Sequence, residues 1–203
     1  MSLASLTLIA PAIGALTLAE VREWTLAQRV LKPALAGAVV LLAAVLADSA
    51  YGLWVLGALA ACAVGDVLLL RKGTGGAFVA GMAAFGLGHL LYIAAFVSLG
   101  LDYRVGVAVG VILAWAAVVR PVLAEAPHGL RLPASAYAAV IIAMVAVTYL
   151  SGTWLVWPAL AFAASDVVVA RNRFTEPQAW HPLLITPLYF GAQFAFALSV
   201  ASF

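Results

Sequence analysis

Two aspartates lie inside long apolar stretches of this 203-residue sequence, and each is followed five residues later by an arginine: Asp66 by Arg71 and Asp166 by Arg171. A carboxyl group in a nonpolar medium is costly and normally faces a protein interior or a wet cavity. Two such groups brought together should not both ionise. One protonated and one ionised carboxyl form the acid/base pair that hydrolysis of an acetal-like bond requires. The alternative is structural, with each aspartate paired to a nearby arginine or to Lys32.

Polar side chains in two further apolar stretches follow helical spacing. Positions three and four residues apart share one helix face. One such face carries Phe78, Gly81, Phe85, His89, Tyr92 and Phe96. A second carries Tyr189 and Gln193, with Thr186 beside them. The polar members serve either as hydrogen-bond partners between packed helices or as proton-relay and substrate-positioning groups.

Two more residues are candidates for the same site. Tyr137 lies in another apolar stretch and has the same two interpretations as the tyrosines above. Lys32, directly before Pro33, either extends its ammonium to a membrane interface or holds a phosphate group.

The elements that position these residues follow from composition. Hydrophobic residues make up 67% of the chain and charged residues only 9%, whereas a soluble domain is about 25% charged. So few charges cannot cover a water-soluble surface, so lipid must be the solvent over most of the molecule. A single cysteine, Cys62, excludes an internal disulfide. The net charge of +2 and the scattered basic residues argue against a nucleic-acid partner.

Apolar runs bounded by charges, proline and glycine predict an all-α transmembrane bundle of eight helices in one domain, residues 1–203. The spans are expected near 3–20, 33–48, 51–70, 77–99, 105–119, 134–151, 153–170 and 182–202. Nine of the ten basic residues fall in the odd-numbered loops, and Arg104 alone lies on the other side. The positive-inside rule then places the odd-numbered loops in the cytoplasm and both termini outside. Eight arginines against two lysines are typical of a GC-rich bacterial gene, which favours a bacterial inner membrane.

The two halves of the chain resemble each other at an offset of 100 residues. Scarce residue types coincide at this offset: Pro33 with Pro133, Trp54 with Trp154, Asp66 with Asp166, and Arg71 with Arg171. Chance coincidence is the alternative to an ancient four-plus-four duplication. Because each half has an even number of spans, the halves would be parallel repeats. The two aspartates would then lie at equal depth on equivalent helices.

The order and spacing of these residues resemble the YhhN family, from about residue 30 to the C-terminus. The resemblance rests on Lys32-Pro33, Gly65-Asp66, Phe78, Gly81, Phe85, Gly88-His89, Tyr92, Ser165-Asp166, Arg173-Phe174, Tyr189 and Gln193. It implies an eight-span hydrolase that cleaves the vinyl ether bond of lysoplasmalogen, or of a related ether lysolipid, to a fatty aldehyde and a glycerophospho-alcohol. It further implies catalysis by Asp66 and Asp166 and no cofactor or metal.

The expected partner is a lysophospholipid drawn from the membrane, with Lys32 on its phosphate. A metal hydrolase is disfavoured because His89 is the only histidine well inside a span, while His128 and His181 lie near loops or span ends. A transporter of small solutes or lipids, using the same buried carboxylates, remains the alternative, since parallel repeats around embedded carboxylates also describe carriers.

Overall fold

The computed structural model describes residues 3–71, 73–101 and 105–203. Within these ranges all regular structure is helical. The elements are α1 (Leu3–Val21), α2 (Thr25–Leu46), α3 (Ala50–Leu69), α4 (Gly76–Ser98), α5 (Val105–Ala124), η1 (His128–Leu130), α6 (Arg131–Leu150), α7 (Val156–Phe174), α8 (His181–Ser199) and η2 (Val200–Ser202). The eight predicted helices are therefore confirmed. The predicted loop positions of Lys72 and Arg104 lie outside the described residues.

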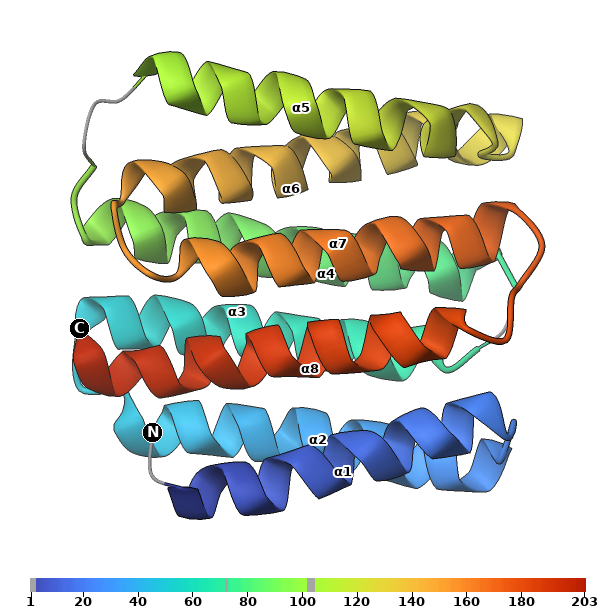
Figure 1. The fold of residues 1–203 in the computed structure, drawn as a ribbon, viewed down its shortest axis with the longest axis horizontal. Helices are drawn as coiled ribbons and strands as arrows, with labels where there is room; N and C mark the ends of the chain where they lie inside the picture. The colour runs from blue at the N-terminus through green and yellow to red at the C-terminus, as the bar shows by residue number, and fades with distance from the viewer. Residues whose placement is uncertain (1–2, 72, 102–104) are drawn as a thin grey trace.

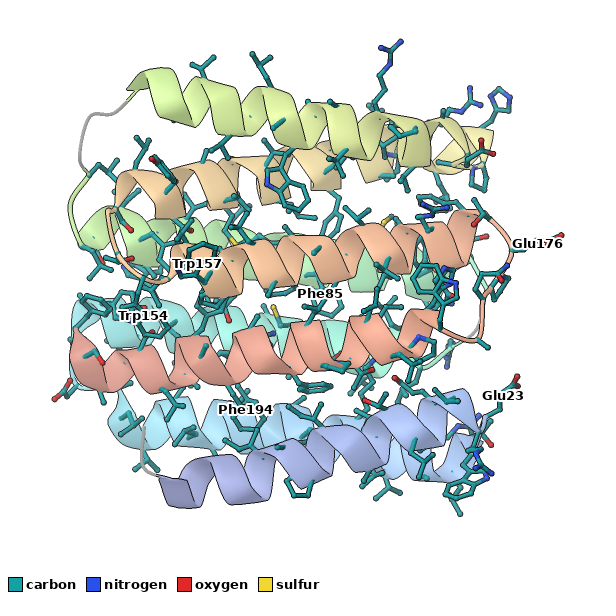
Figure 2. The ribbon with its side chains drawn as sticks, viewed as in Figure 1. Glu23, Phe85, Trp154, Trp157, Glu176 and Phe194 are labelled. Atoms are coloured by element: carbon teal, nitrogen blue, oxygen red, sulfur yellow. The ribbon has the colours of Figure 1, made fainter. Side chains whose placement is uncertain are left out.

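Successive helices run antiparallel, so that the connections alternate between the two ends of the bundle (Figure 1). The connections after α1, α3, α5 and α7 lie at one end, which we call the odd-connection end. The remaining connections and both termini lie at the other. Figure 2 shows Glu23 and Glu176 at the odd-connection end and Trp154 and Trp157 toward the opposite end. This alternation is the one expected of eight consecutive spans.

The outer faces of the helices carry large apolar side chains that are exposed in the isolated chain. Examples are Leu41, Val45, Leu53, Leu87, Leu113 and Trp157. Five of the described segments are long and apolar enough to cross a membrane: α2, α3, α4, His128–Leu150 and His181–Ser202. Exposed apolar surface around hydrogen-bonded helices is the arrangement that lipid requires. The chain is an integral membrane protein.

The predicted start of the second helix and end of the fifth are wrong by five residues or more, and the bounds of the seventh are displaced by three to four residues. The second helix begins at Thr25 rather than at residue 33, so that Lys32 and Pro33 lie within α2. The fifth continues through Pro121 to Ala124, and the seventh runs from Val156 to Phe174, not from 153 to 170. Proline and charge were interpreted as helix ends. Helices in a packed membrane bundle tolerate an internal proline because neighbouring groups satisfy the freed carbonyl, and they extend past the apolar run where charged side chains reach the interface.

The α3–α4 pair is held together by glycines. A Cβ atom at Gly65 would lie 2.6 Å from the Phe85 ring, and one at Gly88 would lie 2.6 Å from the Cys62 sulfur. No side chain fits at such distances, so these two positions let the helix backbones approach closely. The close packing fixes Asp66, next to Gly65, relative to the polar face of α4.

Candidate active site

Asp66 lies in the last turns of α3 and is 2% exposed. The Tyr189 hydroxyl, from α8, donates a hydrogen bond of 2.6 Å to its Oδ2 atom. The Nζ atom of Lys32, from α2, lies 3.7 Å from its Oδ1 atom. The predicted grouping of these three residues is therefore present, and the cation facing Asp66 is Lys32 rather than Arg71.

Lys32 contacts a second carboxylate as well. Its Nζ atom lies 3.8 Å from Oε1 of Glu20, at the end of α1, and the Thr186 hydroxyl donates to Oε2 of the same glutamate. Side chains of both Lys32 and Glu20 are 17% exposed. One ammonium between two carboxyl groups is already compensated. This arrangement does not favour the predicted contact of Lys32 with a lipid phosphate, because the ammonium charge is already compensated within the protein.

Asp166 lies on α7 and has a different set of partners. Its Oδ2 atom accepts from the Tyr137 hydroxyl of α6 at 3.1 Å and lies 3.3 Å from Nε2 of His89, on α4. His89 is fully buried, and its Nδ1 atom faces the Met144 sulfur at 3.2 Å. His89 and Tyr137, both selected from sequence, thus converge on one carboxylate oxygen.

The other predicted residues form a buried relay behind Asp66. The Tyr92 hydroxyl donates to Oε1 of Gln193 at 2.6 Å, and the Gln193 amide donates to the Tyr189 oxygen at 3.0 Å. Tyr189 in turn donates to Asp66. Because all of these side chains are buried, each hydrogen bond fixes the orientation of the next. Tyr92 and Gln193 contact the site through Tyr189 and do not line the cavity described next.

Both aspartates line one cavity of about 90 Å³, which has room for several water molecules. Lys32, Tyr137, Ser165 and Tyr189 also line it. The rest of the wall is apolar and includes Leu69, Phe78, Met82, Phe85, Trp115, Val119, Val122, Leu123, Ile141 and Phe174. No hydrogen bond joins the two carboxyl groups in the described part of the chain. The cavity combines two separately held carboxyls with a large apolar surface.

Comparison with known sequences then decides the family. The model of the YhhN family matches residues 27–200. This chain belongs to the YhhN family. It is 37% identical to the human protein named lysoplasmalogenase TMEM86B over 143 residues, which is 70% of this chain and 61% of that protein. It is 36% identical to the pig protein of the same name over 164 residues, 80% of this chain and 70% of that protein, and 32% identical to the mouse protein over 148 residues. No solved structure matches.

The match thus spans less than two thirds of the human relative's length. The sequence interpretation gave no role to two charged residues, Glu20 at the site and Arg173 beside it. Glu20 precedes the matched residues and ends the first apolar run, and an acidic residue at such a place was the available signal. Arg173 was part of the family resemblance but received no role. It lies in the last turn of α7 and donates to backbone carbonyls at the end of α3.

Proposed function

We propose that this YhhN-family chain hydrolyses the vinyl ether bond of lysoplasmalogen, releasing a fatty aldehyde and a glycerophospho-alcohol. The observation that carries the proposal is the single cavity lined by Asp66 and Asp166 together with an apolar wall. Relatives covering most of this chain are named lysoplasmalogenase, which supports the same substrate class. Neither the relatives' names nor the described geometry favours the transport alternative.

Asp66 is our candidate for the general acid. Lys32 provides one positive charge for two carboxyl groups, Glu20 and Asp66, at nearly equal distances of 3.8 and 3.7 Å. One of the two is best neutral, and burial disfavours the charged form. Glu20 is 17% exposed and Asp66 only 2%, so the proton is assigned to Asp66.

Asp166 is our candidate for the ionised partner. Its Oδ2 atom accepts from the Tyr137 hydroxyl, and His89 with a proton on Nε2 is a second donor to the same atom. Hydrogen bonds donated to a carboxylate favour its ionised form. A carboxylate held in this way stabilises positive charge that develops in the cavity and accepts a proton from water.

The proposed reaction consumes one water molecule. Asp66 transfers its proton to the β-carbon of the vinyl ether, and the α-carbon and ether oxygen then share the charge of an oxocarbenium ion. Water attacks the α-carbon while Asp166 takes one of its protons, which gives a hemiacetal. The bond from the α-carbon to the glycerol oxygen then breaks as Asp166 gives its proton to that oxygen and the hemiacetal hydroxyl gives its proton to Asp66. Aldehyde and alcohol are released, and both carboxyl groups return to their starting states. The chemistry requires no cofactor.

The test is aldehyde release from lysoplasmalogen by purified protein in detergent. We expect Asp66→Asn and Asp166→Asn each to lower turnover by about 10²- to 10⁴-fold, the usual contribution of one general acid or base. Asp48→Asn is the matched control, because Asp48 is exposed in the α2–α3 connection. Turnover at the native rate by either site variant, in protein with native helicity and monodispersity, would refute the assignment.

Placement in the cell is part of the same proposal. The odd-connection end carries Arg22, Arg71, Arg131 and Arg171, so the positive-inside rule assigns it to the cytoplasm of a bacterial inner membrane. The cavity includes side chains near that end, which favours substrate from the inner leaflet.

The four-plus-four repeat is supported by α4 packing on α6 and α8 packing on α2, which are equivalent pairs. The α1–α8 contact has no α5–α4 equivalent among the described residues, so any repeat is imperfect.

A further inference from the structure

Arg173 lies beside the cavity, against its lining residues Phe78 and Leu69, and is held there by the backbone of another helix. Its guanidinium donates to the carbonyl oxygens of Leu69 at 2.9 Å, Gly73 at 3.0 Å and Arg71 at 3.4 Å. It also lies over the Phe78 ring, 5.5 Å from the centroid. These carbonyls belong to the end of α3 and the turn that follows, so the side chain has one held position on the odd-connection side of the site.

The charge of Arg173 has no anionic partner among the described residues. Three of the five N–H donors of a guanidinium are accounted for by the carbonyls, which leaves two for another acceptor. The Lys32 ammonium, by contrast, already contacts two carboxyl groups. Of the two cations, Arg173 is therefore the one suited to an incoming anion.

The spacing from the aspartate fits the length of a lysophospholipid. Arg173 follows Asp166 by seven residues, which puts both on one face of α7, about 10 Å apart along the axis. In a lysoplasmalogen the phosphorus atom is five bonds from the vinyl ether oxygen, about 6 Å when extended. The side chains of Asp166 and Arg173 make up the difference. Phe78 and Phe174, which form an edge-on pair beside the guanidinium, also line the cavity.

We propose that Arg173 binds the phosphate group of the lysophospholipid and so sets the register of the ether bond against the two aspartates. A planar guanidinium matches phosphate oxygens with paired hydrogen bonds, which a lysine ammonium does not. The headgroup then lies at the odd-connection end, and the hydrocarbon chain extends into the apolar part of the cavity. This assignment rests on the lysophospholipid substrate proposed above, but its test does not require cleavage.

The test compares two non-cleavable saturated ethers, 1-O-alkylglycerophosphoethanolamine and 1-O-alkylglycerol, by titration calorimetry in detergent. The wild-type protein should bind the phosphate-bearing ligand more tightly. Arg173→Gln should weaken binding of that ligand by about 10- to 100-fold, the usual effect of losing hydrogen bonds to a charged group, and leave the alkylglycerol unchanged. Arg173→Lys should retain part of the preference, because lysine keeps the positive charge but lacks the paired N–H donors of a guanidinium.

Two further variants separate phosphate binding from a structural role. Arg171→Gln, at an exposed position of the same turn, should keep the native preference, and Lys32→Gln should not abolish it. Equal weakening of both ligands in Arg173→Gln would overturn the proposal and leave only a helix-capping role. Equal affinity of the wild-type protein for the two ligands would also overturn the proposal. Aldehyde release, measured separately, decides the hydrolase proposal alone.

Discussion

Replacing Glu20 with glutamine tests the assignment of the proton to Asp66. In the native protein one ammonium, on Lys32, lies between two carboxyl groups. The Glu20→Gln change removes one negative charge and leaves Lys32 to Asp66 alone. Asp66 then becomes the better anion and loses the proton that the reaction needs. The double variant Glu20→Gln/Lys32→Gln removes the cation as well, so that no positive charge stabilises the ionised form of Asp66.

The size of the effect follows from the geometry. Each carboxyl has an oxygen within 4 Å of the same Nζ atom, so these oxygens are at most about 8 Å apart. At an effective dielectric constant of about 20, two unit charges at that distance repel by about 2 kcal/mol. Relief of this repulsion shifts the ratio of protonated to ionised Asp66 by about 30-fold. Because Asp66 is protonated at the start, turnover of Glu20→Gln should fall by up to about 30-fold near neutral pH, and the double variant should recover to within a few-fold of the native rate.

The assay is initial-rate aldehyde release at constant pH and saturating lysoplasmalogen, with helicity and monodispersity checked for every variant. Glu125→Gln, in the exposed α5–α6 connection, is the matched control and should behave as native. A double variant no more active than Glu20→Gln would refute the charge-balance reasoning. If Lys32 held the substrate phosphate, the double variant would turn over substrate more slowly than either single variant. The two hypotheses therefore predict opposite changes in turnover when Lys32→Gln is added to Glu20→Gln.

Three further predictions concern the relay, the helix packing and the cavity. Tyr189→Phe removes one hydrogen bond to the acid and leaves the Gln193 amide without its acceptor, so turnover should fall about tenfold, as measured by aldehyde release, in a folded protein. Gly88→Ala forces a Cβ atom against the Cys62 sulfur and should lower the free energy of unfolding by about 1–3 kcal/mol, measured as a lower Tm. The double variant Gly88→Ala/Cys62→Ala should recover part of this loss. Gly191→Ala, where the added Cβ meets open space, should lose no stability. Ala138→Leu fills part of the cavity and should raise KM for long-chain substrate while the Tm stays within about 1–2 °C of native.

The helices were predictable from sequence because their signal is local. Long apolar runs separated by charged turns specify eight antiparallel helices, and the scarcity of charge specifies lipid around them. The start of α2 was missed because residues 25–32 carry Arg29 and Lys32 and lead to Pro33, all of which indicate an end rather than an interior. Tertiary contacts of α2 with α1, α3 and α8 hold this turn in a helix.

The site was predictable only in part, for a different reason. Asp66 and Asp166 were recognisable because acidic residues are expensive in apolar helices, and His89 and Gln193 because helical spacing put them on polar faces. Their pairing depends on which helices are neighbours, and the sequence does not state that. The contact of Lys32 with Glu20 therefore became visible only once α1 and α2 were seen side by side.

One part of the cavity wall, from α5, is entirely apolar, and this bears on the substrate. The aspartates, Lys32 and Tyr189 come from α2, α3, α7 and α8, whereas α5, which packs on α6 and α7, lines the cavity only with apolar residues such as Trp115 and Val122. A solute soluble in water gains nothing from the α5 wall. A single-chain amphiphile satisfies both walls at once, because its hydrocarbon buries apolar surface while its ether group faces the carboxyls. The proposed binding of the hydrocarbon chain along α5 and the proposed reaction at the carboxyls therefore belong to one cavity.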